Sequence, residues 1–329
     1  MLQTTLPEMV YALNPTFAWM VTILDVLNET LPACPACGNQ LWQKGIQTKD
    51  YSISGEWFEL KTCSNCGLKM TWPQPEAESI GRYYASSNYI SHSDTKTGLV
   101  NKLYHRARQY MLKKKFEWVT GGSGKSTGNL LDVGAGTGHF AHYMQQQGWE
   151  VLALEPDETA RKVGAEKLQI NILPLEALAK QAPVSFDVIT LWHVLEHVHD
   201  LEGYVDHFHS ILKNDGTLVI AVPNYGSRDA KHYNSQWAAY DVPRHLWHFS
   251  PEAMNQLLTR HGFQIIKKLD MPLDAFYVSM LSEKYKGNYF FGPVAAFISG
   301  FRSYWTGRKN KDRASSIIYF SRKIPSESI

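Results

Sequence analysis

The sequence predicts an α/β protein built on a doubly wound parallel sheet, with a smaller cysteine-containing segment ahead of it. Three observations lead to this fold class. Glycines alternate with other residues between an apolar run and a helical pattern at 130–147, strand and helix patterns alternate from there to the C-terminus, and all four cysteines lie in two pairs near the N-terminus. At 329 residues, with 44% hydrophobic and 19% charged residues, the chain has room for one large domain and an attachment.

The glycine turn is the strongest local signal. Apolar residues at 130–133 form the end of a buried strand, Gly134, Gly136 and Gly138 follow at alternate positions, and the helical pattern 139–147 begins at once. A strand that turns directly into a helix needs glycines, because a Cβ would block the tight turn and the close approach of a ligand. Since the helix N-terminus presents free N–H groups to that ligand, the turn indicates a nucleotide-type pocket.

The spacing of the turn indicates which nucleotide it suits. The glycines follow G-x-G-x-G, not the G-x-G-x-x-G that seats a pyrophosphate, and Asp132 stands two residues before Gly134. A carboxylate there repels phosphate but suits an α-amino group or a sulfonium cation. The next predicted strand, 150–155, ends in Glu155, and an acid at that place accepts hydrogen bonds from both ribose hydroxyls.

Together these residues resemble the first motifs of the class I S-adenosylmethionine (SAM) methyltransferases, and the resemblance runs from about Asn129 to the C-terminus. It implies a Rossmann-like, seven-stranded sheet whose last strand inserts antiparallel beside the sixth, and SAM as the cofactor. The glycine turn would shape the methionine pocket, Glu155 would hold the ribose, and Leu175 and Glu176 would border the adenine. The residues expected to contact SAM are Asp132, Gly134, Ala135, Gly136, Thr137, Gly138, Phe140, Glu155, Pro156, Leu175, Glu176, Trp192, His197 and Tyr84.

The elements of this domain are expected in a regular order. The expected strands are 130–133, 150–155, 170–173, 186–192, 217–222, 263–271 and 315–322, and the expected helices are 158–167, 201–213 and 251–261. Ser250 caps the last of these helices, with Pro251 at its first position and Gly262 just past its end. A further helix with one buried face is expected within 99–119, and the glycine-rich run 121–128 is expected to be a flexible linker.

The cysteines form two C-x2-C pairs, Cys34 with Cys37 and Cys63 with Cys66, with 25 residues between the pairs and a glycine after each. The segment resembles a zinc ribbon, and four thiolates suit one tetrahedral zinc. Because four sulfur ligands leave no open position, this zinc would be structural. Two disulfides are the alternative, which a cytoplasmic chain without other cysteines disfavours.

These motifs divide the chain. The expected parts are an N-terminal extension at 1–33, the zinc ribbon at 34–75, a lid and linker helix at 76–127, and the methyltransferase domain at 128–329 with an apolar insertion at 272–314. Tyr83, Tyr84, Tyr89 and His92 are candidates for the lid over the cofactor.

The N-terminus and the charge indicate a cytoplasmic protein. The first 43 residues contain no Lys or Arg, so the apolar stretch 17–27 lacks the basic region of a signal peptide, and Asp25 interrupts it. Residues 1–33 are either native or a non-native extension. The net charge of +2 argues for neither a nucleic-acid nor a membrane partner, and the basic run at 113–115 reads as a solvated face.

The stretch 289–301, YFFGPVAAFISGF, is almost wholly apolar but too short to span a bilayer. We favour a cap packed over the active site or a contact in a homodimer. The alternative is an interfacial segment that makes peripheral membrane contact.

The segment 186–200 resembles the fourth-strand motif of a broad group of small-molecule methyltransferases. It lacks the Asn/Asp-Pro-Pro-aromatic tip of enzymes that methylate base amino groups, so base N-methylation is disfavoured. The ubiquinone-biosynthesis O-methyltransferases resemble it too and bind a divalent cation through Glu-x-x-Glu-His, where this chain has His193, Glu196 and His197. Either Glu196 and His197 bind such a cation, or they fix the turn while His193 lines the pocket.

The long polar loop 223–251, called here the acceptor loop, follows the fifth strand at the sheet edge where substrate sites lie. Its PRHLWHFSP run, from Pro243, resembles an element of the same methyltransferase group. A histidine there suits an OH acceptor, because its pKa lies near neutral pH and it can take the proton as the methyl arrives. We expect His245 to be this base, with His193 as its rival.

The sequence therefore favours a SAM-dependent methyltransferase acting on a small molecule, with O-transfer favoured over C-transfer. A zinc ribbon ahead of the domain also resembles the C-methyltransferases of nucleotide-linked deoxysugars. An RNA methyltransferase whose ribbon grips nucleic acid is a second hypothesis, which the net charge of +2 does not support. A non-catalytic SAM-binding module is the third. The methyl acceptor itself is not readable from the sequence.

Overall fold

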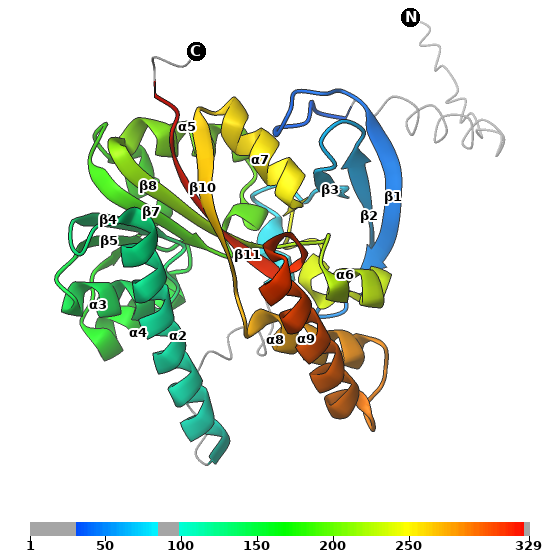
Figure 1. Cartoon of the computed structure of the whole chain (residues 1–329). Helices are drawn as coiled ribbons and strands as arrows, with labels where there is room; N and C mark the ends of the chain where they lie inside the picture. The colour runs from blue at the N-terminus through cyan, green and yellow to red at the C-terminus, as the bar shows by residue number, and fades with distance from the viewer. Residues whose placement is uncertain (1–30, 85–98, 326–329) are drawn as a thin grey trace, which may run out of the picture. The chain divides into compact units, whose positions relative to one another are not determined.

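The computed structural model describes residues 31–84 and 99–325 (Figure 1). Residues 34–329 form one compact unit, distinct from residues 1–33. Most of the expected N-terminal extension and the lid candidates Tyr89 and His92 lie outside the described residues.

The larger sheet has the predicted architecture. Within the described residues it contains seven strands in the order β10-β11-β8-β7-β4-β5-β6. These are β4 (Asn129–Val133), β5 (Glu150–Leu154), β6 (Ile172–Leu173), β7 (Phe186–Trp192), β8 (Leu212–Pro223), β10 (Phe263–Asp270) and β11 (Ser316–Lys323). Strand β11 runs antiparallel to both of its neighbours, β8 and β10, whereas β4 to β8 pair in parallel. The prediction of a Rossmann-like sheet with an antiparallel last strand is confirmed.

The helices cover this sheet through their apolar faces. They are α2 (Leu99–Ser123), α3 (His139–Gln146), α4 (Glu158–Leu168), α5 (Leu201–Ile211) and α7 (Pro251–Arg260). One buried cluster joins Leu112 and Val119 of α2 to Leu130, Val188 and Phe320 of the strands. At α7 the Ser250 hydroxyl accepts a hydrogen bond from Ala253 N, and Gly262 follows with a φ of 77°, as the sequence predicted.

Several boundaries differ from the sequence predictions, and two of the differences have a clear tertiary cause. Helix α2 runs to Ser123 and so includes Gly121 and Gly122, the first two residues of the expected linker. Gly122 lies against the Phe320 ring, where a Cβ would sit 2.2 Å from the nearest ring atom. Strand β8 begins at Leu212, five residues before the predicted 217, because Leu212 pairs with Phe186 of β7. Both contacts are tertiary, so the secondary-structure propensity of the local sequence does not predict them.

The ribbon forms a second sheet. Strands β1 (Trp42–Lys49), β2 (Trp57–Cys63) and β3 (Lys69–Trp72) pair antiparallel, and β9 (Trp247–His248) of the acceptor loop pairs with β3 as a fourth strand. The ribbon is therefore bonded to the part of the methyltransferase domain that follows the fifth strand. The division of the chain at residues 75 and 127 stays a prediction.

The apolar insertion folds as two packed helices, α8 (Asp274–Tyr285) and α9 (Gly292–Lys309) (Figure 1). The aromatic side chains of 289–301 are largely exposed. No helix among the described residues has the length and apolar character needed to cross a membrane. The remaining short elements are α6 (Arg228–Tyr233), η1 (Ile80–Tyr83), η2 (Leu175–Lys180), η3 (Leu195–His197), η4 (Asn234–Gln236), η5 (Ala238–Tyr240) and η6 (Lys311–Arg313).

Candidate functional site

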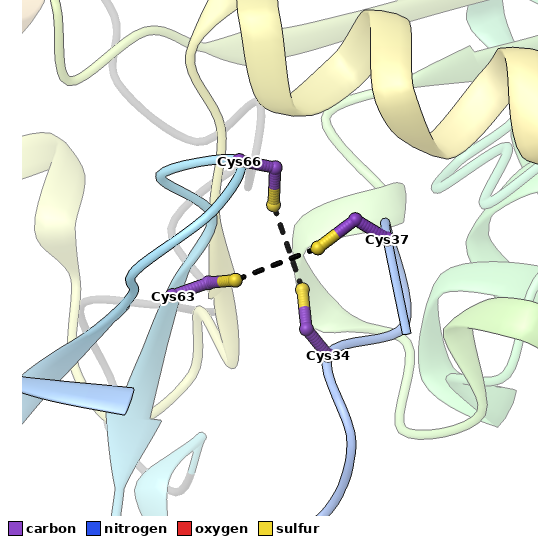
Figure 2. A group of neighbouring side chains, drawn as sticks. All are labelled: Cys34, Cys37, Cys63 and Cys66. Carbon is purple, nitrogen blue, oxygen red and sulfur yellow. Dashed lines mark hydrogen bonds between the residues drawn. The ribbon is translucent and has the colours of Figure 1, made fainter. Parts of the chain in front are cut away.

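The four cysteine sulfurs point toward a common centre (Figure 2). The Sγ atoms of Cys34 and Cys66 lie 3.5 Å apart and those of Cys37 and Cys63 lie 3.6 Å apart, and all four sulfurs lie within 4.8 Å of one another. None of the four forms a disulfide. Zinc–sulfur bonds of about 2.3 Å in a tetrahedron place sulfurs about 3.8 Å apart. The cysteine geometry therefore fits one zinc ion.

The glycine turn after β4 has the backbone that its sequence predicted. Gly134, Gly136 and Gly138 have φ values of 71°, 56° and 79°, in the left-handed region that favours glycine. A Cβ on Gly134 would lie 2.4 Å from Val194, whereas one on Gly136 would meet no atom within 4 Å. The open space beside Gly136 is where a ligand can approach the backbone.

Glu155 lies against this turn. Its carboxylate accepts hydrogen bonds from Gly136 N at 2.7 Å and from Asp157 N at 3.0 Å. Burial raises the pKa of Glu155 above its ordinary value, and the two N–H donors partly offset that effect. The glycine turn and the end of β5 are thus joined through one fixed carboxylate, which can accept further hydrogen bonds from a ribose.

Asp132 is buried at the end of β4, where its Oδ1 accepts a hydrogen bond of 2.7 Å from Thr190 Oγ1. Burial raises the pKa of Asp132 to about 7, although Lys115 acts in the opposite direction. The ring centroids of Phe140 and Trp192 lie 5.4 Å apart in an edge-to-face contact beside it. Three of the predicted SAM contacts are therefore gathered at one place.

Lys115, on α2, is a site residue that the sequence interpretation missed. Its Nζ lies 4.4 Å from the Trp192 ring centroid and 5.6 Å from that of Phe140. Burial lowers the pKa of Lys115 to about 8, opposed by the charges of Asp132 and Asp274. The basic run 113–115 is thus not wholly a solvated face, because its last ammonium faces the candidate SAM pocket. No signal in the sequence separated Lys115 from its two basic neighbours.

His193 lies between two carboxylates. Its Nδ1 is 3.2 Å from Glu196 Oε1, and its Nε2 is 2.9 Å from Asp274 Oδ2 at the start of α8. Burial alone would lower the pKa of His193, but the two carboxylates outweigh it and raise the pKa to about 10. His193 is therefore protonated at neutral pH and donates through both ring nitrogens. Its φ of 59°, unusual for a non-glycine residue, is held by these contacts.

His197 and His245 meet edge to face, with ring centroids 4.6 Å apart. The Nδ1 of His245 lies 2.9 Å from Ala239 O, and the Nδ1 of His197 lies 2.9 Å from Arg244 O. Because a carbonyl oxygen only accepts, both rings donate from Nδ1, which leaves Nε2 of the neutral His245 ring as an acceptor. Burial lowers the pKa of His245 to about 4, so its ring is neutral at pH 7.

Glu196 completes this group. Its Oε2 is buried and has no hydrogen-bond partner among the described residues. One ligand atom each from Glu196, His197 and His245 lies within 4.8 Å of the others. The three side chains form an electron-rich group that can accept a proton or hold a cation.

The ribbon holds the segment that carries His245. Thr71 Oγ1 of β3 donates to His245 O at 2.6 Å, and Thr71 N donates to Leu246 O at 2.9 Å. The buried Arg244 donates from Nη2 to Asp50 Oδ1 of the ribbon at 2.9 Å and to Asp241 Oδ1 at 2.7 Å. The orientation of His245 therefore depends on the ribbon.

The other predicted site residues occupy the same edge of the sheet, with fewer contacts. Ala135 and Thr137 lie within the glycine turn, and Pro156 follows Glu155. Leu175 and the exposed Glu176 lie in η2, directly after β6. The Tyr84 hydroxyl lies 3.1 Å from His197 Nδ1, which places the end of the lid segment beside the histidine pair.

The family of methyltransferase domains matches residues 103–268, half of the chain. The chain belongs to this family. Its sheet order and its glycine turn, with Asp132 before the turn and Glu155 beside it, are those of a class I SAM-dependent methyltransferase.

Curated relatives are similar over part of their length. An uncharacterized methyltransferase of Alkaliphilus oremlandii is 30% identical over 113 residues, which are 32% of this chain and 51% of the relative. The ubiquinone biosynthesis O-methyltransferase of Leptothrix cholodnii is 29% identical over 119 residues, 33% of this chain and 51% of the relative. The mitochondrial enzyme of that name from Bos taurus is 28% identical over 163 residues, 45% of this chain and 44% of the relative. The chain spans about half the length of these relatives.

Solved structures are similar at low identity. Magnesium protoporphyrin IX methyltransferase from Synechocystis PCC 6803 has a TM-score of 0.49 and 13% identity, covering 75% of this chain and 99% of that one. A SAM-dependent methyltransferase from Archaeoglobus fulgidus has a TM-score of 0.45 and 18% identity, covering 66% and 94%.

Proposed function

We propose that this protein transfers the methyl group of SAM to a hydroxyl oxygen of a small-molecule acceptor, with His245 as the general base. The observation that carries the proposal is the state of His245: a neutral ring whose Nδ1 is committed to Ala239 O and whose Nε2 is an acceptor at the substrate edge of the sheet. The relatives named ubiquinone biosynthesis O-methyltransferases also favour O-transfer over C-transfer.

The residues around the glycine turn fit SAM. The open side of Gly136 admits the cofactor, Glu155 accepts from the ribose hydroxyls, and Asp132 suits the cationic part of the methionine moiety. Lys115 has no carboxylate within ion-pair distance among the described residues, so the cofactor's carboxylate suits its ammonium. Leu175 and Glu176 would border the adenine.

SAM supplies a methyl group that is already activated, so the protein contributes position and deprotonation. The C–S bond breaks with its electron pair on sulfur, the O–C bond forms, and the acceptor's proton goes to His245 Nε2. Protonated His193 lacks a free lone pair, so we assign it a positioning role, holding Glu196 beside the pair of histidines. This assignment favours His245 over its rival.

His245→Ala should lower turnover about 10²–10⁴-fold and leave SAM affinity nearly unchanged. His232→Ala, at an exposed histidine of the same loop, is the matched control. Because burial lowers the pKa of His245 to about 4, wild-type activity should rise with pH through about 4 and stay level through the usual imidazole range. If the His245→Ala enzyme has normal turnover, His245 is not the general base.

The substrate class is tested by labelling. The protein is incubated with methyl-labelled SAM and separate small-molecule and RNA fractions of a cell extract, and the products are identified by mass spectrometry. We expect the wild-type protein to label small molecules and the His245→Ala variant to label none. Label in RNA would favour the nucleic-acid hypothesis, and SAM binding without any labelled product would favour a non-catalytic module.

A divalent cation is a second candidate role for the same group of side chains. Glu196 Oε2 has no hydrogen-bond partner in the part of the chain that the structure describes, and it lies beside His197 and His245. A cation there would satisfy this buried carboxylate oxygen, which favours the role. Such a cation would orient the acceptor oxygen, and His245 would then serve as a ligand. Activity that is lost on chelation and restored by a divalent ion, with zinc retained at the cysteines, would establish this role.

We further infer that Cys34, Cys37, Cys63 and Cys66 hold one structural zinc, supported by their spacing and their sulfur distances. The bonds from Thr71 and Asp50 to the acceptor loop support a role for the ribbon in positioning that loop, without a nucleic-acid partner. A cytoplasmic location stays a prediction from the N-terminal sequence.

A further inference from the structure

Helix α9 has its large side chains on the outside. Its buried stripe consists of small residues: Gly292, Ala296, Gly300, Ser303 and Gly307. A Cβ on Gly300 would lie 2.9 Å from Phe276 Cα, and one on Gly307 would lie 2.8 Å from Ala314 Cα. The side of α9 with small residues therefore packs closely against the protein, and the opposite, apolar side of the helix faces solvent.

We call the exposed stripe the aromatic face. It consists of Phe290, Phe291, Val294, Phe297, Phe301 and Trp305, all exposed, with Phe290 at 87%. The rings of Phe297 and Phe301 stack at 6.5 Å, and those of Phe301 and Trp305 at 6.4 Å. Single exposed apolar residues are ordinary, but a continuous surface of this kind marks a contact with another apolar phase.

The segment that carries the aromatic face is basic, and its nearest acids, Glu283 and Asp229, are buried. From 284 to 311 the chain has six basic residues and no acidic one. Asp270 pairs with Arg308 and Lys311, but Arg228, Arg302 and Lys309 have no carboxylate within ion-pair distance among the described residues. Arg228 and Arg302 line a pocket of about 420 Å³ together with Phe301, Trp305 and Thr306.

We propose that the aromatic face docks on the surface of an anionic lipid bilayer. The exposed rings would enter the boundary between headgroups and acyl chains, and Arg228, Arg302 and Lys309 would contact lipid phosphates. Exposed aromatic residues on one side of a helix, with basic side chains beside them, are the pattern of an interfacial helix. Four of these six residues belong to α9, which packs against α8 (Figure 1).

A second copy of the chain fits the face less well. In a two-fold symmetric contact the same surface meets itself, so the arginines of one copy would face those of the other. Among the described residues no carboxylate lies within ion-pair distance of Arg228 or Arg302 to offset this repulsion, so charge complementarity favours lipid phosphate over a homodimer.

The test is flotation of the full chain with vesicles of phosphatidylcholine, with and without phosphatidylglycerol. Wild type should float with the anionic vesicles, and high salt should weaken the binding. Phe290→Ser/Val294→Ser should lower the partition coefficient at least about tenfold. Arg228→Gln/Arg302→Gln should lower it and reduce its dependence on salt. Trp57→Ser is the matched control, because Trp57 on β2 and Val294 are both 64% exposed.

Each variant should unfold at the same temperature as wild type and bind SAM with the same affinity. These controls ensure that a change in flotation does not come from misfolding. The proposal is overturned if wild type stays unbound, or if it floats equally with neutral vesicles. A dimer in sedimentation that the Phe290→Ser/Val294→Ser variant dissociates, without vesicle binding by wild type, would assign the face to a second copy instead.

Discussion

Asp50 links the ribbon to the acceptor loop, and its replacement by asparagine tests that link. The carboxylate is buried and accepts from Arg244 Nη2 at 2.9 Å, from Ser52 N and Ser54 N at 2.9 Å each, and from Ser54 Oγ at 3.0 Å. Burial alone would raise the pKa of Asp50, but Arg244 and the backbone donors lower it below its ordinary value. The group is therefore a buried anion paired with a buried cation.

The cost of Asp50→Asn follows from these contacts. Asparagine keeps one acceptor oxygen but turns an NH₂ group toward Ser54 N, so the bond from Ser54 N to Oδ2 is lost. Arg244 also loses one of its two anions. Breaking a buried pair from one side costs about 3–5 kcal/mol, and we expect the free energy of unfolding to fall by that amount. Since Asp241 still holds Arg244, the lower end is expected.

Urea unfolding measures this loss, and methyl-transfer kinetics measure its effect on His245, the residue after Arg244. A small displacement of a catalytic group can lower turnover about 10²-fold, so we expect slower turnover with SAM affinity within about twofold of wild type. The control is Asp215→Asn, which breaks a surface pair with Lys125 and should cost about 0–1 kcal/mol. Normal turnover in a destabilised Asp50→Asn protein would refute the coupling of ribbon and base, and unchanged stability would refute the energetic argument itself.

Three further predictions concern the cofactor, the metal and acid stability. Glu155→Ala should weaken SAM binding by about 2–4 kcal/mol in calorimetry, because the ribose loses a charged acceptor. The control Glu158→Ala, on the exposed side of α4, should leave SAM binding unchanged. Equal SAM affinities of the two variants would show that Glu155 does not hold the ribose. Purified wild-type protein should contain about one zinc ion per chain, and the Cys63→Ser variant should contain none. A wild-type protein that is well folded without zinc would contradict the metal assignment. Burial alone would raise the pKa of Asp187, but Lys125 and Lys213 lower it to about 2 from 3.8. Because the folded pKa is depressed, Asp187 contributes stability of about 2 kcal/mol above pH 4 that is lost as the pH falls through about 2. Asp187→Asn should therefore be less stable than wild type at pH 7, and the difference should shrink as the pH is lowered toward 2. A constant difference would exclude titration of Asp187 as its cause.

The sequence by itself determined the features that depend on neighbouring residues or fixed spacing. The turn at Gly134, Gly136 and Gly138 is readable because only glycine tolerates its backbone, and its φ values are those expected. The parallel pairing of β4 to β8 follows from the alternation of strand and helix patterns. The spacing of the four cysteines likewise placed their sulfurs together.

The tertiary structure decided which distant side chains meet and which protons they carry. Asp274 meets His193 across 81 residues, and Asp50 meets Arg244 across 194, contacts that no local pattern encodes. Lys115 shares its sequence context with two other lysines, and only the packing of α2 directs its ammonium toward Trp192. The contrast between His193, whose pKa rises to about 10, and His245, whose pKa falls to about 4, depends on burial and on neighbouring charges, because an imidazole's pKa is set by its surroundings in three dimensions.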